Sequence, residues 1–356
     1  MRTKVVIIGG GPSGLLLSRL LSLENIDNMV LEKQTREHVQ GRIRAGVLEN
    51  GTIDMLRLAG VSNRLDSEGF KHNGIELSFK NHGFRIDLKK LTDKHVTVYG
   101  QTEVTKDLYE IIEKENCNII NSAEDVLPQN IGKNNSFVTF KKNGIEKKIT
   151  CDFIVGCDGY HGISRKVIPD NLTNIFERVY PFGWLGILSE TPPVKEELIY
   201  ANHGNGFALA SMRNQNLSRY YIQTSLGDNI EDWSDKRFWE ELKRRLPMEA
   251  SETIITGPSI EKSIAPLRSF VCEPMNWNNL FLVGDAAHIV PPTGAKGLNL
   301  AVSDVYYLFN GLKKYYLLGN NEDLENYSTK ALSRVWKAIR FSWWMTTTFH
   351  KFPEQT

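Results

Sequence analysis

The feature that most constrains this chain is an apolar run that ends in a cluster of glycines, VVIIGGGPSG. The β-branched residues of Lys4–Ile8 predict a strand, and the apolar residues of Ser13–Leu23 recur at helical spacing. A second apolar stretch, Asn28–Leu31, predicts another strand. Since a strand, a helix and a strand in this order form a βαβ unit with parallel strands, we expect an α/β fold that begins with a Rossmann-like parallel sheet.

The glycines of this unit have the spacing of a dinucleotide-binding turn. Gly9, Gly11 and Gly14 fit the pattern GxGxxG between the strand and the helix. Small residues let the backbone approach a pyrophosphate, and a helix N-terminus supplies free amides and the positive end of the dipole. Glu32, at the end of the second strand, is placed to accept hydrogen bonds from ribose hydroxyls. The pattern alone also occurs in ordinary tight turns, but strand, helix and acid in this order favour a dinucleotide.

Polar residues further along the chain favour FAD as this dinucleotide. Arg42 and Arg44, in GRIRAGVLENG, precede an expected helix, where two guanidinium groups can hold a pyrophosphate. Each arginine taken alone is also consistent with charge on a surface loop. Asp158, in FIVGCDG, and Asp285, in LFLVGDAAHIVPPTGAKGLNLA, each follow a buried strand. Because the carboxyl ends of parallel strands border the ligand crevice, Asp285 is suited to a ribityl hydroxyl.

The segment after Asp285 carries a turn that enters a helix. Residues 291–293 stiffen the turn, and helical spacing begins near Leu298 and Asn299. We expect the amides of this helix N-terminus to point into the same crevice. There they would stabilise negative charge on the pyrimidine ring of a reduced flavin.

Composition argues against several classes of partner. The 356 residues include 43 basic and 42 acidic ones, so a net charge of +1 gives no reason to expect nucleic acid or an anionic membrane surface. No apolar run is long enough to span a membrane. The four cysteines show neither CxxC spacing nor histidines at metal-ligand spacing, so we expect no metal site, no disulfide framework and a cytoplasmic protein.

The chain divides into three expected parts. Residues 1–175 predict the nucleotide-binding domain, from which the loop 72–97 reaches an inserted β layer. Residues 176–267 predict that inserted, mainly antiparallel β domain, and residues 268–356 a flavin-contacting segment with C-terminal helices. Individual elements are expected at Gln101–Glu115 (helix), Phe137–Ile149 (hairpin about Asn143 and Gly144), Phe153–Gly156 and Leu280–Val283 (buried strands), Tyr180–Ser225 (strand-rich), and Leu298–Tyr316 and Leu324–Phe349 (helices).

One hairpin of the inserted layer, FALASMRNQNLSRYYIQ, carries unusual polar residues. Alternate residues of a strand share a face, so Ser211 and Arg213 lie on the same side as Phe207, while Arg219 and Tyr221 share a face across the turn. If this face is buried, the guanidinium of Arg213 needs an anion such as a ligand carboxylate. If it is solvated, the arginine is simply hydrated. The hairpin alone leaves both interpretations open.

Taken together, these motifs resemble the class A flavoprotein aromatic hydroxylases, in particular members that act on 4-hydroxybenzoate. The resemblance extends from Met1 to about Pro353. It is carried, in collinear order, by GGGPSG, GRIRAGVLE, VYGQTEVT, GCDGYHGISR, ERVYPFGWLG, IYANH, SIAPLRSF and GDAAHIVPPTGAKGLNLA.

The resemblance implies a set of site residues for each ligand. With the glycine motif and Asp158 added, the expected FAD-binding residues are Gly9, Gly11, Ser13, Gly14, Glu32, Arg42, Ile43, Arg44, Ala45, Gly46, Val47, Gln101, Asp158, Asp285, Leu298 and Asn299. The expected substrate-binding residues are Tyr200, Ser211, Met212, Arg213, Tyr221 and Pro292.

Roles within the substrate site also follow from the resemblance. Ser211 and Arg213 would bind the substrate carboxylate, with a further hydrogen bond from Tyr221. Tyr200 and the Pro292 carbonyl would contact the phenolic oxygen. Tyr200 would begin a proton relay whose solvent end is His72. Arg219 would brace the flavin and loop positions.

The implied activity converts 4-hydroxybenzoate, O2 and NAD(P)H to 3,4-dihydroxybenzoate (protocatechuate) through a flavin C4a-hydroperoxide. Because a phenol with a pKa near ~10 is mostly protonated at neutral pH, the site must favour the phenolate and pass its proton outward. The chain has a single GxGxxG, so NADPH or NADH is expected to dock transiently; by resemblance the candidates are Lys33, His38, Arg44, His161 and Arg268. The segment KQTREH leaves the choice between the two nicotinamides open.

Two alternatives remain at this stage. One is a related hydroxylase of 4-aminobenzoate or another substituted benzoate, and the other is a non-catalytic flavoprotein that binds aromatic acids. Relatives often carry a further segment with a second relay tyrosine, so either this chain is shortened, or another residue or water completes the relay. A homodimer is expected, and Trp343 and Trp344 suit either a core or a dimer surface.

Overall fold

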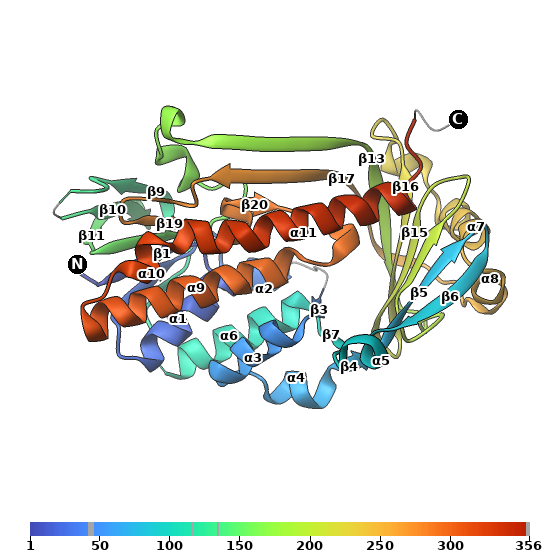
Figure 1. The fold of residues 1–356 in the computed structure, drawn as a ribbon, viewed down its shortest axis with the longest axis horizontal. Coiled ribbons are helices and arrows are strands. Elements are labelled where there is room, and N and C mark those ends of the chain that lie inside the picture. Colours follow the sequence, from blue (N-terminus) through green and yellow to red (C-terminus); the bar gives the residue numbers. More distant parts are fainter. Residues whose placement is uncertain (42–45, 116, 134, 354–356) are drawn as a thin grey trace.

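The computed structural model describes residues 1–41, 46–115, 117–133 and 135–353. A six-stranded sheet lies in the half of the molecule that carries the N-terminus, at the left of Figure 1. Its strands, in spatial order, are β18 (Asn276–Trp277), β19 (Leu280–Leu282), β12 (Phe153–Gly156), β1 (Val5–Ile8), β2 (Asn28–Leu31) and β8 (Ile119–Ile120). Every pair is parallel except β18–β19. β1, β12 and β19 are buried throughout, as expected of strands covered on both faces.

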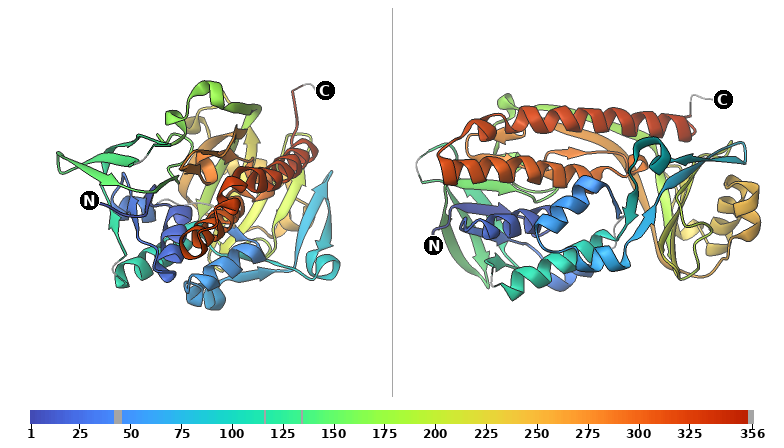
Figure 2. Two further views of the ribbon diagram at one scale, coloured as in Figure 1. Left: turned by 60° about the vertical axis from the view of Figure 1, so that its left-hand side comes forward. Right: turned by 60° about the horizontal axis from the view of Figure 1, so that its bottom comes forward.

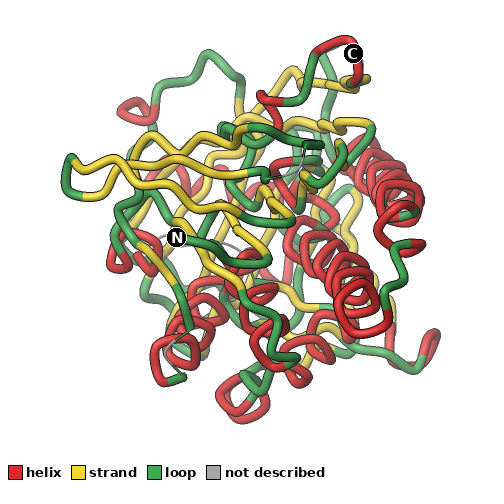
Figure 3. The backbone as a smooth tube through the Cα atoms, turned by 90° about the vertical axis from the view of Figure 1, so that its left-hand side faces the viewer, coloured by secondary structure: helices red, strands yellow, loops and turns green. Residues whose placement is uncertain are grey.

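Helices cover this sheet. α1 (Pro12–Leu23) follows β1 and packs against both α6 (Gln101–Lys114) and α9 (Gly297–Leu318). α9 in turn packs against α11 (Tyr327–Phe349), and Figure 2 shows these two long helices side by side. Shorter helices complete this half: α2 (Arg36–Gly41), α3 (Asn50–Leu58), α4 (Asn63–Glu68) and α10 (Glu322–Glu325). Figure 3 shows most helices gathered on one side of the strands.

A second sheet of eight strands forms the other half, at the right of Figure 1. Its strands, in spatial order, are β20 (His288–Ile289), β17 (Ser259–Glu273), β13 (Asn174–Ser189), β16 (Leu217–Thr224), β15 (Ala208–Asn214), β14 (Ile199–Asn202), β5 (Gly74–Phe79) and β6 (His82–Asp87). All neighbours are antiparallel except β14 and β5. β5 and β6 come from the stretch 72–97, which therefore reaches the inserted layer.

The long strands β13 and β17 join the two halves (Figure 1). They pair from Asn174 with Glu273 to Ser189 with Ser259, so residues far apart in sequence form one ribbon. The expected domain boundary at 175/176 falls just after the start of β13, and the one at 267/268 falls within β17. The strands thus run continuously through both boundaries.

The two faces of the eight-stranded sheet have different partners. On one face, Ala208, Ala210 and Ile222 pack with residues of α7 (Asp235–Arg245) and α8 (Met248–Thr253). On the other face, Phe207 and Leu209 pack with the end of α11. The alternation predicted for the hairpin is therefore confirmed.

Two three-stranded sheets complete the fold. One consists of β9 (Glu124–Gln129), β10 (Phe137–Lys142) and β11 (Ile145–Thr150), whose β10–β11 turn has positive φ at Asn143 and Gly144, as the sequence predicts. The other consists of β3 (Val47–Leu48), β7 (Val96–Val98) and β4 (Phe70–His72) and lies between the two halves (Figure 1), with α5 (Leu88–Thr92) beside it.

The predicted fold class is confirmed, and most elements begin and end within two residues of expectation. One helix differs: Leu324–Phe349 is interrupted, because α10 ends at Glu325 and α11 begins at Tyr327. The side chain of Asn326, between them, donates to the carbonyl of Glu322 at 3.0 Å and closes α10. Among the described residues, no helix combines the length and apolar character needed to cross a bilayer.

Candidate active site

The glycine turn after β1 forms a cradle in which a ligand can approach the backbone. A Cβ at Gly14 would lie 2.0 Å from the carbonyl oxygen of Gly9, so this position tolerates no side chain. Gly9 has φ +110°, and its Cβ would meet Cys157 O at 2.3 Å. A Cβ at Gly11, in contrast, would meet nothing within 4 Å. Gly9 and Gly14 allow close packing of strand and helix, and Gly11 leaves open space where a pyrophosphate would lie.

The helix that follows is prepared for an anion. No side chain caps the N-terminus of α1, and its first turn contains no acidic residue. Its free amides and dipole therefore remain available to a phosphate. Glu32 is buried at the end of β2, where its carboxylate accepts from Gly10 N at 2.6 Å and from Gln34 N at 2.8 Å. These amides hold Glu32 beside the glycine turn, as a ribose acceptor requires.

A second uncapped helix N-terminus belongs to α9, whose first turn also lacks acidic residues. The buried side chain of Asn299 is fully used within the protein. Its amide group donates to the carbonyls of Val47 and Ala295, both at 2.9 Å, and its oxygen accepts from Glu49 N and Thr52 Oγ1. These bonds hold residues 47–52 against α9. The backbone amides of the first turn, at Leu298 and Asn299, remain free of side-chain caps and suit a flavin anion.

Asp158 keeps one carboxylate oxygen available. Its Oδ2 accepts from the amide and the hydroxyl of Ser164, both at 2.9 Å. Its Oδ1 is buried and has no partner within the described chain. Burial raises the pKa of Asp158. An orphaned buried acceptor at the end of a parallel strand fits a ligand hydroxyl, so together with the open cradle the residues present fit FAD.

Asp285 lies in a 3-10 turn (η4, Gly284–Ala286) just past β19, with its side chain exposed. A buried acid that the sequence interpretation missed holds this turn in place. Asp304, on α9, accepts from Gly284 N at 2.9 Å and from His288 Nε2 at 2.7 Å. Burial alone would lower the pKa of His288, but the Asp304 carboxylate raises it above its usual value. The one signal for Asp304 in the sequence was its position as a single acidic residue within an apolar helical segment.

Other expected FAD residues are placed as follows. Gly46 is buried beside the residue that follows β7, where a Cβ would lie 2.0 Å from Tyr99 O. Val47 begins β3, and Gln101 is the first residue of α6. Ser13 is buried in the first turn of α1. Arg42, Ile43, Arg44 and Ala45 lie outside the described residues.

Three of the expected substrate residues, Tyr200, Ser211 and Tyr221, lie on the face of the eight-stranded sheet that meets the end of α11. Tyr200 on β14 pairs with Leu209 on β15, and Leu209 pairs with Tyr221 on β16. In the next row, Ser211 pairs with Arg219. Directly paired residues share a face, so these side chains lie together. Met212 points to the opposite face, and only its carbonyl, which accepts from Ser211 Oγ at 3.3 Å, adjoins this group.

The two arginines of the β15–β16 hairpin differ in their partners. Arg219 donates to Glu261 Oε1 at 2.9 Å and to Ser263 Oγ at 3.4 Å. Within the described chain, Arg213 has no carboxylate at ion-pair distance, and its Nε is buried without a hydrogen-bond partner. Burial lowers the pKa of Arg213, whereas the Tyr221 side chain acts to raise it. Arg213 is thus a half-buried cation prepared for an anion that the chain itself does not supply.

Tyr200 and Pro292 are the residues expected to contact the phenolic oxygen. Burial raises the pKa of Tyr200 to about 12, so its hydroxyl stays protonated and can donate. Pro292 lies in the 3-10 turn η5 (Pro292–Gly294) that precedes α9, and its carbonyl accepts from Ala295 N at 2.9 Å. A carbonyl has two lone pairs, so one remains for a ligand.

His72, which by resemblance is expected at the solvent end of the relay, is buried. Neither ring nitrogen has a partner within the described chain, and burial lowers the pKa of His72. His72 pairs with Val96 across β4 and β7, which places its side chain on the opposite side of this small sheet from Lys71.

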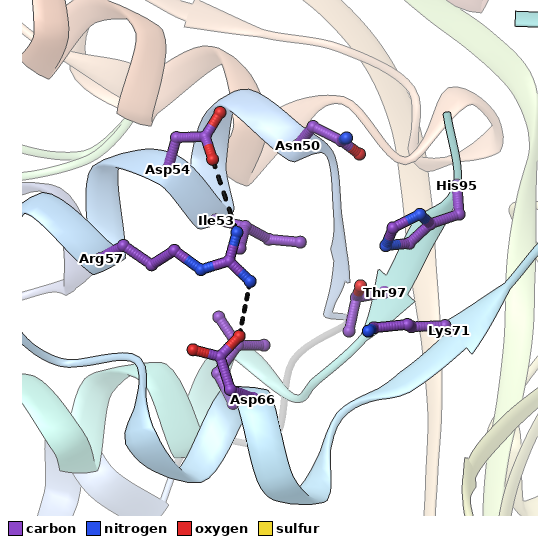
Figure 4. A pocket seen from close by; sticks show the side chains of 9 residues that line it. Asn50, Ile53, Asp54, Arg57, Asp66, Lys71, His95 and Thr97 are labelled. Carbon is purple, nitrogen blue, oxygen red and sulfur yellow. Dashed lines mark hydrogen bonds and ion pairs between the residues drawn. The ribbon is translucent and has the colours of Figure 1, made fainter. Parts of the chain in front are cut away.

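The side of the small sheet that carries Lys71 borders a separate pocket of about 70 Å³ (Figure 4). Arg57 and Asp66 bond to each other across it at 2.6 Å, and Lys71 and His95 line its other end. None of its lining residues belongs to the expected sites, so it lies outside them.

The expected nicotinamide residues fall into two groups. Lys33 and His38 are exposed near the end of β2 and on α2. His161 and Arg268 both contact Tyr160: the His161 and Tyr160 ring centroids are 5.0 Å apart, and the Arg268 guanidinium lies 4.8 Å from the Tyr160 centroid. Arg268 also pairs with Glu177 at 3.1 Å. The structure contains no group of histidine, cysteine and acidic side chains suited to a metal within the residues it describes.

Comparison with known proteins agrees with this geometry. Residues 2–342 match the FAD binding domain family. A p-hydroxybenzoate hydroxylase of Acinetobacter baylyi is 54% identical over 357 residues, which cover 100% of this chain and 88% of the relative. A 3-(3-hydroxy-phenyl)propionate/3-hydroxycinnamic acid hydroxylase of Burkholderia vietnamiensis is 22% identical over 85% of this chain and 55% of its own.

Solved structures share the fold. A probable FAD-dependent monooxygenase from Pseudomonas aeruginosa, PqsL, superposes with a TM-score of 0.85 over 98% of this chain and 97% of its own, at 18% identity. A p-nitrophenol 4-monooxygenase from Pseudomonas putida gives 0.83 over 99% and 91%, also at 18% identity. The family match and the 54% identity, with a cradle that fits the cofactor, lead to one conclusion: the chain belongs to the FAD binding domain family of flavoprotein monooxygenases and is an FAD-dependent aromatic hydroxylase.

Proposed function

We propose that this enzyme is a 4-hydroxybenzoate 3-monooxygenase. It converts 4-hydroxybenzoate, O2, NAD(P)H and a proton to 3,4-dihydroxybenzoate, water and NAD(P)+. The observation that carries the proposal is Arg213, a half-buried guanidinium without a carboxylate partner in the described chain, which interacts with the Tyr221 side chain. A benzoate carboxylate supplies the missing anion. The relative at 54% identity is itself a p-hydroxybenzoate hydroxylase.

The roles of the site residues follow from this orientation. Arg213, Ser211 and Tyr221 bind the carboxylate, with the Met212 backbone beside them, and Tyr200 donates to the phenolic oxygen at the other end of the ring. A donated hydrogen bond favours the phenolate over the phenol. The free lone pair of the Pro292 carbonyl accepts a hydrogen bond from the phenol before its proton leaves. When bound, FAD supplies the redox chemistry that activates O2 and places one oxygen atom on the ring.

The cofactor residues are proposed in the same way. The amides of Gly11, Ser13 and Gly14 hold the pyrophosphate, Glu32 the ribose, and Asp158 and Asp285 further hydroxyls. The first turn of α9, at Leu298 and Asn299, would stabilise negative charge on the flavin. Gly9, Gly46, Val47 and Gln101 shape the cradle.

Proton release and reduction complete the cycle. His72, neutral because burial lowers its pKa, is proposed as a later member of the relay from Tyr200, with its unpaired ring nitrogens ready for water. NADPH or NADH docks transiently, with Lys33, His38, His161 and Arg268 as its candidate contacts. Arg219, held by Glu261, braces the site beside Tyr221.

Two further proposals concern the whole molecule. Large apolar side chains that are partly exposed line a groove between β13, β17 and α11, among them Phe176, Trp336 and Trp343. Such a surface supports a homodimer. The free cysteines support a cytoplasmic location.

One assay tests the function. Enzyme loaded with FAD is mixed with NADPH or NADH, with and without 4-hydroxybenzoate, and the product is identified by chromatography. The proposal expects nicotinamide oxidation that the substrate stimulates, with 3,4-dihydroxybenzoate as product. A panel with 4-aminobenzoate and 3-hydroxybenzoate, read by oxygen uptake, measures specificity. Faster coupled turnover of another benzoate would replace the proposed substrate.

A further inference from the structure

The last turn of α11 is anchored to the substrate sheet by three separate strands. From β14, Asn202 Nδ2 donates to the carbonyl of Phe349 at 3.1 Å. From β16, Gln223 Nε2 donates to the carbonyl of Lys351 at 2.6 Å. From β13, the indole nitrogen of Trp184 donates to His350 Nε2 at 2.7 Å. The first two bonds use backbone acceptors, so only the third depends on the identity of a side chain at this end of α11.

His350 is held in one protonation state and one tautomer. Its side chain is 1% exposed, and its ring stacks on Phe207 and Phe182 with centroids 4.4 Å and 4.7 Å away. Because an indole nitrogen can only donate, Nε2 must be the acceptor and Nδ1 must carry the proton. Nδ1 donates that proton to the carbonyl of Thr346 at 2.9 Å. Burial lowers the pKa of His350 to about 3, so the ring is neutral at the working pH of an enzyme.

The bond from Trp184 to His350 orients a side chain that touches the proposed substrate site. The Trp184 ring lies against the Tyr221 ring, with centroids 5.0 Å apart and planes inclined by 46°. On another side, a Cβ at Gly186 would lie 2.6 Å from Tyr221 Cε1, so Tyr221 occupies the space above this glycine. The guanidinium of Arg219 lies 5.1 Å from the centroid of the same ring. Tyr221 is thus confined by Trp184, Gly186 and Arg219.

We propose that His350 is a positioning residue for substrate binding: it fixes the Trp184 indole, which holds Tyr221 in the orientation that meets the substrate carboxylate beside Arg213. This inference rests on the proposed function, because it assigns Tyr221 to the carboxylate. It goes beyond that function by linking a residue at the end of the long helix α11 to substrate affinity. His350 itself does not touch the substrate or the flavin.

Three variants test the proposal in the FAD-loaded enzyme. His350→Leu removes the acceptor and leaves the indole N–H buried without a partner, whereas His350→Gln keeps an acceptor near the position of Nε2. Thr347→Ala, on the same turn but bonded only to carbonyls of its own helix, is the matched control. Substrate affinity is measured by titrating the flavin absorbance with 4-hydroxybenzoate, and KM and kcat are measured from steady-state turnover.

The proposal expects a specific split between these quantities. His350→Leu should weaken substrate affinity at least fivefold and raise the substrate KM by the same factor, with the nicotinamide KM within twofold of wild type. His350→Gln should restore both substrate constants to within twofold, and Thr347→Ala should leave them unchanged. Trp184→Phe removes the same bond and part of the ring that confines Tyr221, so it should weaken affinity at least as much as His350→Leu. The His350→Leu, Trp184→Phe double variant should lose no more than Trp184→Phe alone, because the bond is already absent.

Other outcomes overturn the proposal. If His350→Leu loses thermal stability and FAD but the remaining holoenzyme binds 4-hydroxybenzoate normally, His350 has a structural role alone. Equal substrate affinity in His350→Leu and His350→Gln would also mean that His350 has a structural role alone, because the acceptor would then make no difference to binding. Failure of the proposed function is seen separately, because wild-type enzyme would then bind or turn over 4-hydroxybenzoate no better than benzoate without the 4-hydroxyl.

Discussion

Arg213 and Arg219 both lie beside Tyr221 on the β15–β16 hairpin, yet of the two only Arg219 has a carboxylate partner among the described residues. Glu261 neutralises Arg219 at 2.9 Å, while Arg213 has the Tyr221 side chain beside it and a buried, unpartnered Nε. A buried cation without an anion destabilises a fold unless a ligand completes it. The asymmetry between two neighbouring arginines therefore points to the place where an anionic substrate binds.

Replacement of Arg213 tests this directly. Arg213→Ala should weaken 4-hydroxybenzoate binding by about 2 kcal/mol or more, because a charge-assisted hydrogen bond to the carboxylate is lost. The substrate affinity of Arg213→Lys should lie between those of wild type and Arg213→Ala, since lysine keeps the charge but loses the paired donors. Titration of the flavin absorbance measures the affinity. Arg237→Ala, an arginine of α7 that lies over Trp233, is the control. Wild-type affinity in Arg213→Ala would remove the carboxylate assignment.

The hydroxyl of Tyr200 should matter for chemistry more than for binding. Tyr200→Phe keeps the ring that packs near Phe349, at 5.9 Å between centroids, but removes the donor to the phenolic oxygen. We expect FAD content and substrate affinity close to wild type, with slow hydroxylation and most reduced cofactor lost as hydrogen peroxide. Oxygen uptake with and without catalase, compared with the yield of dihydroxybenzoate, measures the coupling. Full coupling in this variant would exclude Tyr200 from the relay.

The open space at Gly11 can be tested against a glycine that faces solvent. Gly11→Ala meets no protein atom within 4 Å, so the protein without cofactor should keep its thermal stability. Its methyl group enters the space assigned to the pyrophosphate, and FAD affinity should fall at least tenfold in a fluorescence titration. Gly51→Ala, in α3, also meets nothing within 4 Å and should bind FAD normally, with stability unchanged or raised by about 0.5–1 kcal/mol. Equal FAD affinity in both variants would place the pyrophosphate elsewhere.

Local patterns in the sequence predicted the parts of the fold that depend on neighbouring residues. The βαβ start follows from the spacing of apolar residues and glycines in residues 4–31, and the alternation of residues 207–213 predicted which side chains share a face. The burial of that face was not predictable, because it depends on α11, more than a hundred residues away along the chain. The pairing of Asn174 with Glu273 was not predictable for the same reason, because the two residues are far apart along the chain.

The contacts near the site that the sequence did not predict also join residues far apart along the chain. Trp184 and His350 are separated by 166 positions, and neither side chain is unusual in its own segment. His72 is also buried, although its sequence context, FKHNG, is more often that of a solvated loop histidine. The sequence indicated Asp304 only as a single acidic residue on the apolar side of a helix, where a buried acid needs a partner.

Removal of Asp304 should disturb the turn that carries Asp285. Asp304→Asn takes the charge from a buried pair and leaves His288 without its counter-ion, which costs about 3–5 kcal/mol. The amide can still accept from Gly284 N, so the turn itself can form. We expect a lower urea midpoint and faster loss of FAD. The double variant Asp304→Asn, His288→Gln, which removes both members, should recover part of this loss; a double variant less stable than Asp304→Asn would argue against the pair.

The stability of the protein towards acid should depend on His350. Its pKa is about 3 in the folded state and about 6.5 in the unfolded chain, so the unfolded state binds the proton first as the pH falls. Stability from this residue is present above pH 6.5 and decreases by about 1.4 kcal/mol per pH unit as the pH falls towards 3. His288 acts in the opposite sense, since its raised pKa stabilises the protonated folded form at low pH.

Urea unfolding at pH 7 and pH 5 should therefore show wild type losing about 2 kcal/mol more than His350→Gln. His82→Gln, at an exposed histidine, is the matched control and should follow wild type. Parallel losses in wild type and His350→Gln would mean that the ring is not held neutral in the aromatic cage, and the tautomer assigned to it would be wrong.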